Sequence, residues 1–275
     1  MDIGKKRREW DEEAHQMPLI DGVEVESIDA DGVPCEWVWV AGADRAKVLF
    51  FVHGGGFTSG SCVTHRDLAS RLSLASGLSA LLPGYRLAPE HPFPAGLEDV
   101  VAVYRWLLAS GFDSTYIAFG GDSAGGNLAL AALLSLRDTD APMPAALALL
   151  SPWLDLTFTG ESMISRESVD IGITKVDLLR SRAHYIGSDD GADRLMSPLF
   201  ADLSGLPPML IHAGDNEILL SDSERLVEKA HDAGVDATLK VWPGMRHVFH
   251  GDAATVTEAQ QAIDEIGVFL AAKVG

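Results

Sequence analysis

The chain has 275 residues, 47% of them hydrophobic and 22% charged, which is typical of a globular protein able to bury a substantial core. Its formal net charge of −19 repels nucleic acid and anionic membranes, so neither is expected as a partner, and it favours neutral or cationic ligands. No apolar run is long enough to span a membrane, the N-terminus lacks a signal segment, and two cysteines, Cys35 and Cys62, indicate free thiols in the cytoplasm.

Strand and helix patterns alternate along most of the chain. A charged surface helix is predicted over residues 5–15, and from about residue 35 short apolar runs such as VLFFV at 48–52 alternate with amphipathic segments. We predict strands at 48–52, 78–82, 116–119, 146–150, 209–212 and 238–241, and helices at 66–75, 96–109, 125–136, 175–185, 221–233 and 257–272. This alternation predicts a single α/β domain over 1–275, with a mostly parallel sheet covered by helices on both faces.

The regular pattern lapses between about residues 155 and 203, where breaks rich in Ser, Asp and Gly surround one helical stretch. A long irregular insertion in a compact domain usually serves binding, so we expect it to form a cap. Its apolar residues either line a pocket or pack within the cap: Met163, Ile164, Ile171 and Ile173.

Two glycine-rich motifs follow predicted strands. Gly121-Asp122-Ser123-Ala124-Gly125 lies between a strand and a helix, the context of a nucleophile elbow that holds Ser123 clear of the sheet. HGGGF at residues 53–57 follows the strand at 48–52, and its glycines allow N–H groups to turn inwards as an oxyanion hole. Gly55, Gly56 and Ala124 are the expected donors. The Lys-Ser/Thr of a phosphate-binding loop is missing after HGGGF.

A general base and an acid are expected in later loops, because hydrolases of this kind run in the order Ser, acid, His. His247 and His250 both follow the last predicted strand; His247, after a Pro-Gly turn and beside apolar residues, is the better candidate. The acid should follow the strand at 209–212, where Asp215, Glu217 and Asp222 are available. No group of residues has metal-site or dinucleotide-site spacing, so no metal or cofactor is expected.

Taken together, these motifs resemble the bacterial hormone-sensitive-lipase-like esterases. The resemblance runs from about residue 36 to the C-terminus and rests on HGGG, YRLAPE with PFPA, GDSAGG, SPW at 151–153, SPL at 197–199 and LPP at 206–208. It implies an α/β-hydrolase fold, a cap formed by 1–20 and about 155–203, bracing roles for Glu90, His91 and Asp99, and Ser-His-acid chemistry on short acyl esters. Many members carry Asp-Pro-Leu at the acid; the text here, G-x-x-E-x-L-L-x-D-S, is similar to a branch whose acid is Glu, which favours Glu217 over Asp215.

The predicted function is therefore hydrolysis of a small carboxylic ester through an acyl-enzyme on Ser123. Hydrolysis of a lactone, amide or carbamate, or transfer to an alcohol, would use the same residues. A non-catalytic small-molecule receptor is a rival from another class, because the fold includes a receptor that has lost its catalytic His. A homodimer through an edge strand is also compatible with the fold.

Overall fold

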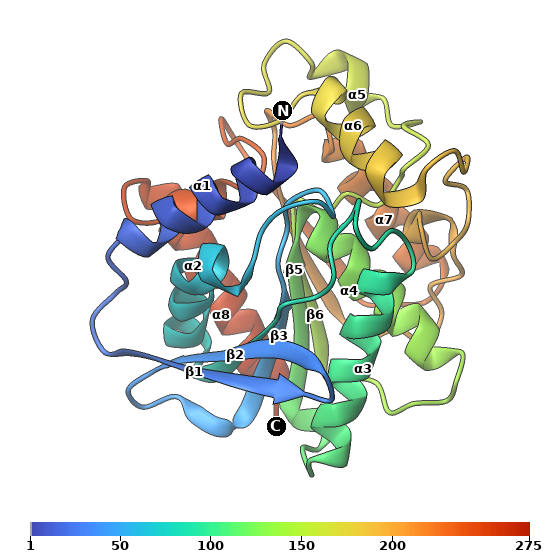
Figure 1. The fold of residues 1–275 in the computed structure, drawn as a ribbon. Helices are drawn as coiled ribbons and strands as arrows, with labels where there is room; N and C mark the ends of the chain where they lie inside the picture. Colours follow the sequence, from blue (N-terminus) through green and yellow to red (C-terminus); the bar gives the residue numbers. More distant parts are fainter. Residues whose placement is uncertain (1) are drawn as a thin grey trace.

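The computed structural model describes residues 2–275, and its central feature is an eight-stranded sheet in the order β1-β2-β4-β3-β5-β6-β7-β8 (Figure 1). β1 and β2 are antiparallel to their neighbours, and the other strands are parallel. The strands are β1 (Val23–Ala30), β2 (Val33–Val40), β3 (Asp44–Val52), β4 (Leu78–Pro83), β5 (Ile117–Asp122), β6 (Ala146–Leu150), β7 (Met209–Gly214) and β8 (Ala237–Trp242). The predicted mostly parallel sheet is thus confirmed.

Helices cover both faces of the sheet because the central strands are apolar on both sides. In β3, Phe50 packs into one apolar cluster with helices α3 (Ala95–Ala109), α4 (Ser123–Arg137) and α7 (Leu220–Asp232). Its neighbour Phe51 points to the opposite face, into a second cluster with α2 (Cys62–Ser76) and α8 (Thr257–Lys273). Successive side chains of a strand alternate between faces, so a run such as VLFFV supplies two cores at once.

The first hairpin, β1 and β2, was not among the predicted elements. β1 is an edge strand whose side chains are mostly exposed, so it has no apolar run that marks a buried strand. The sequence does indicate the turn of this hairpin, because Asp-Gly at residues 31–32 is a pair favoured in two-residue hairpin turns. In the structure both residues have positive φ, 57° for Asp31 and 88° for Gly32, as such a turn requires.

Three further helices lie beyond one end of the sheet (Figure 1): α1 (Ile3–Gln16) next to α2, and α5 (Ser162–Ser165) and α6 (Lys175–Ile186) on the other side. Short 3-10 turns η1 (Ser114–Tyr116), η2 (Pro198–Phe200) and η3 (Phe249–Asp252) complete the structure. The other predicted elements are present, with ends that differ by a few residues. Within residues 2–275, no helix has both the length and the apolar character needed to cross a membrane.

Candidate active site

Ser123 stands on a sharp turn between β5 and α4. Its φ of +50° is strained for a residue with a side chain, and the flanking glycines make room for it. A Cβ atom on Gly121 would lie 2.6 Å from the Gly125 carbonyl oxygen, and one on Gly125 would lie 2.1 Å from the Val52 oxygen. The turn therefore requires both glycines of the G-x-S-x-G motif, as in a nucleophile elbow.

His247 reaches this turn from the loop after β8. Its Nε2 lies 2.9 Å from Ser123 Oγ, and both side chains are almost completely buried. The alternative candidate, His250, lies in η3, and its Nε2 is 3.5 Å from His212 Nδ1. Burial, followed by the nearby His212 and His247, lowers the pKa of His250 well below its usual range. The geometry of a general base is therefore found at His247.

Of the three acid candidates, Glu217 is the one beside His247. Its Oε1 lies 3.8 Å from His247 Nδ1, and neither atom has a hydrogen-bond partner within residues 2–275. The other oxygen, Oε2, accepts hydrogen bonds from Gly214 N at 2.9 Å and Ser151 Oγ at 2.7 Å. Glu217 is completely buried. A carboxylate in this position can orient the imidazole ring and stabilise its protonated form.

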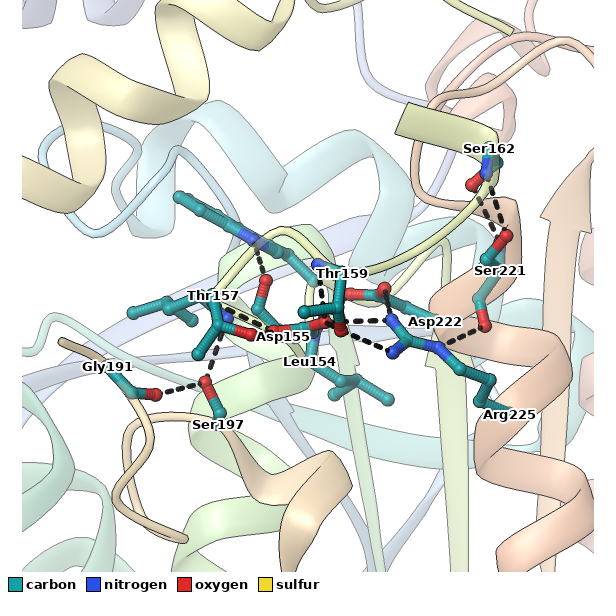
Figure 2. A network of polar contacts seen from close by, with 12 residues as sticks. Leu154, Asp155, Thr157, Thr159, Ser162, Gly191, Ser197, Ser221, Asp222 and Arg225 are labelled. Atoms are coloured by element: carbon teal, nitrogen blue, oxygen red, sulfur yellow. Dashed lines mark hydrogen bonds and ion pairs between the residues drawn. The ribbon is translucent and has the colours of Figure 1, made fainter. Parts of the chain in front are cut away.

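Asp215 and Asp222 are occupied elsewhere. Asp215 accepts a hydrogen bond from Gly244 N at 2.6 Å and so holds the turn after β8. Asp222 belongs to a polar network at the start of the 155–203 segment (Figure 2), where it accepts from Leu154 N at 2.8 Å and from Arg225 at 2.8 Å. Arg225 also binds Asp155 at 3.0 Å. Burial raises the pKa of Asp222 to about 7, although Arg225 opposes this.

The HGGGF loop passes in front of Ser123. Gly55 and Gly56 have φ values of 116° and 64°, and a Cβ on Gly55 would lie 2.1 Å from the Ser59 carbonyl oxygen. Neither glycine N–H takes part in a backbone hydrogen bond among residues 2–275. Unpaired donors next to a nucleophile can stabilise a developing oxyanion.

Asp122, which precedes Ser123, had no predicted role. It accepts a hydrogen bond from Gly54 N at 2.9 Å and lies 3.2 Å from His65 Nε2, so it ties the elbow to the HGGGF loop. Burial alone would raise the pKa of Asp122, but His65, His53 and the Gly54 N–H together lower it. The only local signal for this contact was the position of an Asp between Gly121 and Ser123.

The three residues expected to brace the loops, Glu90, His91 and Asp99, differ in how deeply their side chains are buried. Asp99 is buried and accepts hydrogen bonds from Arg86 N at 2.8 Å and from the Arg86 guanidinium at 2.7 Å, which holds the YRLAPE segment. Glu90 is half exposed and binds Arg7 of α1 at 2.8 Å. His91 is exposed.

A cavity of about 420 Å³ opens onto Ser123 and His247. Its walls come from α1 (Trp10), from α2 (Leu68) and from α6 and the loop before it (Ile173, Leu178). Of the four apolar residues considered for the pocket, only Ile173 lines it: Met163 is buried in the core, and Ile164 and Ile171 are 76% and 86% exposed. Acidic side chains outnumber basic ones along the walls: Asp67, Asp122, Asp177 and Asp252 against Lys6 and Arg246.

Comparisons with known proteins agree on one family. A family model described as the alpha/beta hydrolase fold matches residues 49–251. An acetyl-hydrolase of Streptomyces hygroscopicus is 42% identical over 240 residues, covering 87% of this chain and 80% of the relative, and an esterase of Acinetobacter venetianus is 40% identical, covering 90% and 82%. The crystal structure of an esterase from the bacterial hormone-sensitive lipase family superimposes with a TM-score of 0.97 at 45% identity, covering 100% of this chain and 93% of that one.

Proposed function

The chain belongs to the α/β-hydrolase family, in its bacterial hormone-sensitive-lipase branch, and we propose that it hydrolyses small carboxylic esters through Ser123, His247 and Glu217. Ester hydrolysis is the activity of this family branch, and the chain is a carboxylic-ester hydrolase. The observation that carries the residue assignment is the 2.9 Å contact between His247 Nε2 and Ser123 Oγ at a strained elbow.

Hydrolysis then takes two steps. His247 removes the proton of Ser123 Oγ while that oxygen attacks the ester carbonyl, and the resulting imidazolium donates the proton to the departing alcohol. Water, activated by His247 in the same way, cleaves the acyl-enzyme and frees Ser123. Glu217 holds the ring of His247 and stabilises its positive charge at each step.

The oxyanion formed in both steps needs hydrogen-bond donors. We assign the N–H groups of Gly55, Gly56 and Ala124. In support of this assignment, the two glycines have no backbone acceptor among residues 2–275, and Ala124 directly follows the nucleophile at the start of α4. Losing one such donor costs about a hundredfold to a thousandfold in rate in a comparable hydrolase.

A cap over the site would limit the length of the acyl group that the substrate can carry. We propose that residues 1–20 and about 155–203 form this cap, because Trp10 and Leu178 from these segments line the cavity. Arg7 fastens α1 to the end of the HGGGF loop by donating to Thr58 O, and to the YRLAPE segment by donating to Ala88 O, each at 2.7 Å. A cavity of about 420 Å³ fits an ester with a short acyl chain, and the net charge of −19 favours neutral or cationic substrates over anionic ones.

The proposal is tested by Ser123→Ala, assayed with p-nitrophenyl acetate. Activity should fall by about a millionfold, because only the oxyanion hole and binding would remain, while circular dichroism should show an intact fold. A folded variant that keeps a tenth of the wild-type rate would refute Ser123 as nucleophile. Wild-type protein without any turnover would instead favour the receptor alternative, and a panel of lactones, amides and carbamates would distinguish the other acyl-transfer reactions.

We also propose that the protein works in the cytoplasm, and as a homodimer joined at an edge strand of the sheet, either β1 or β8. Cys35 and Cys62 are buried free thiols, which suits a reducing compartment. β8 pairs on one side only, with β7. Sedimentation of the wild type and of Val241→Lys, on the exposed side of β8, would test the dimer.

A further inference from the structure

Ser151, the first residue after β6, occupies a strained and completely buried position between two loops of the site. Its φ is +48°, a left-handed conformation that a residue with a side chain rarely adopts. Its backbone N–H donates to His212 O at 2.7 Å, which fixes the segment against the end of β7. Strain of this kind persists only where the surrounding structure enforces it, and it is common at functional sites.

The hydroxyl group of Ser151 connects the acid loop to the histidine loop. Ser151 Oγ donates to Glu217 Oε2 at 2.7 Å and accepts from Val248 N at 3.0 Å. Val248 directly follows His247 and is itself left-handed, with φ of +48°. One hydroxyl thus contacts the carboxylate and the backbone that carries the imidazole.

The same segment also contacts the nucleophile turn. Trp153 N donates to Ser123 O at 3.0 Å, and Asn127 Nδ2, in the helix that Ser123 begins, donates to Trp153 O at 2.9 Å. Residues 151–153 therefore touch the three chain segments that carry Ser123, Glu217 and His247.

We propose that Ser151 is a positioning residue for ester hydrolysis: its hydroxyl holds Glu217 so that Oε1 faces His247 Nδ1, and it fixes the histidine loop at the matching distance. This inference rests on the proposed roles of Ser123, Glu217 and His247. With Oε2 held by Ser151 and Gly214 N, the carboxylate cannot rotate, so Oε1 is left facing the imidazole. Without the hydroxyl, one of these two restraints and the link to Val248 are lost.

The experiment compares Ser151→Ala and Ser151→Gly, each in the wild-type chain and in Glu217→Ala. Glycine accepts the positive φ without strain, so it separates the hydroxyl from the backbone conformation and gives a folded variant if Ala does not. We expect both single variants to lose about 10- to 100-fold in kcat, as for other partners that orient a reacting group, with KM changed less than about twofold. In the Glu217→Ala background the further loss in kcat should be clearly smaller than in the wild-type chain, because no carboxylate is left to orient and only the link to Val248 N can still be lost.

A Ser151→Gly enzyme with more than half of the wild-type kcat would overturn the proposal. The proposal would also fail if Ser151→Gly lowered kcat by the same factor in the Glu217→Ala background as in the wild-type chain, because a general loosening of the fold would act in this way. Substitutions of Ser123 and His247 in parallel separate this test from the proposed function. If those abolish turnover while Ser151 variants remain active, only the role of Ser151 fails.

Discussion

Replacing Glu217 by Gln is the sharpest test of the acid, because it removes the charge and keeps the shape. Glu217 Oε1 and His247 Nδ1 are 3.8 Å apart and both side chains are buried. Two opposite charges at about 4 Å interact by about 4 kcal/mol at an effective dielectric constant of about 20. Since about 1.4 kcal/mol corresponds to a factor of ten in rate, the loss of imidazolium stabilisation should lower kcat about a thousandfold. Loss of the correct ring orientation can bring this to about ten-thousandfold.

The assay is hydrolysis of p-nitrophenyl acetate under saturating conditions, with Asp215→Asn and Asp222→Asn as matched controls. Asp215→Asn keeps an oxygen that can accept from Gly244 N, and we expect it to retain about half of the wild-type rate or more. Asp222→Asn should lower thermal stability rather than kcat, because Asp222 binds Arg225 and the backbone of Leu154.

The opposite pattern would refute this reasoning. If folded Glu217→Gln kept a tenth of the wild-type rate while Asp215→Asn were inactive, the acid would be Asp215 and the loop would have to rearrange during the reaction. Circular dichroism and thermal unfolding of each variant would show whether a low rate reflects chemistry or a damaged fold.

Three further predictions concern the pocket, the second histidine and acid stability. Rates should peak for acyl groups of roughly two to eight carbons in the cavity, and faster cleavage of long-chain triglycerides than of butyrate esters would contradict the cap. His250→Gln should keep most of the wild-type kcat at pH 8 where it folds, whereas His247→Gln should lose nearly all of it. In the native state, burial lowers the pKa values of His53, His212 and His250, so these side chains stay neutral at pH 5 to 6. In the unfolded chain they become protonated below about pH 6.5, and unfolding therefore takes up protons at these three residues. Asp222 acts in the opposite direction and releases one proton on unfolding, because burial raises its native pKa to about 7. The free energy of unfolding in urea should therefore fall by at least about 1.4 kcal/mol per pH unit between about pH 6 and 5, and a flat profile would contradict it.

The fold could be predicted because its strongest signals are local. A continuous apolar run such as 48–52 must be buried on both faces, and alternation with amphipathic helices leaves few arrangements other than a covered parallel sheet. The first hairpin was missed for the same reason: β1 lies at the sheet edge, gains little from burial and so carries a weak pattern. The helix predicted from residue 66 begins at Cys62, because Ser61 and Thr64 form a capping box that the apolar spacing does not reveal.

Some residues of the site can be predicted from local sequence, whereas others are identified only by contacts with residues that are distant in the sequence. That Ser123 and His247 follow the ends of strands can be read from the sequence, and parallel strands bring their carboxyl ends to one edge of the sheet. The choice among Asp215, Glu217 and Asp222 cannot be read in this way, because all three lie within one loop and helix start. What separates them in the structure are contacts with residues far away in sequence: Gly244 for Asp215, Ser151 for Glu217, and Leu154 and Arg225 for Asp222.

These contacts also explain why the residues that support the site went unrecognised. Asp122 ends β5 and Ser151 directly follows β6, and although both belong to sequence motifs, the motifs alone indicate no role for either side chain. Their importance arises from what the tertiary fold brings to them: the Gly54 N–H for Asp122, and Glu217 and Val248 N for Ser151. Because a buried polar side chain is expensive unless it is hydrogen-bonded, a Ser or Asp completely buried at a strand end should be examined first for a partner in the site. Through Asp122 and Ser151, hydrogen bonds join the elbow to the HGGGF loop and Glu217 to the histidine loop. We therefore expect substitution of Ser151 to lower the rate of hydrolysis, but by less than substitution of Glu217.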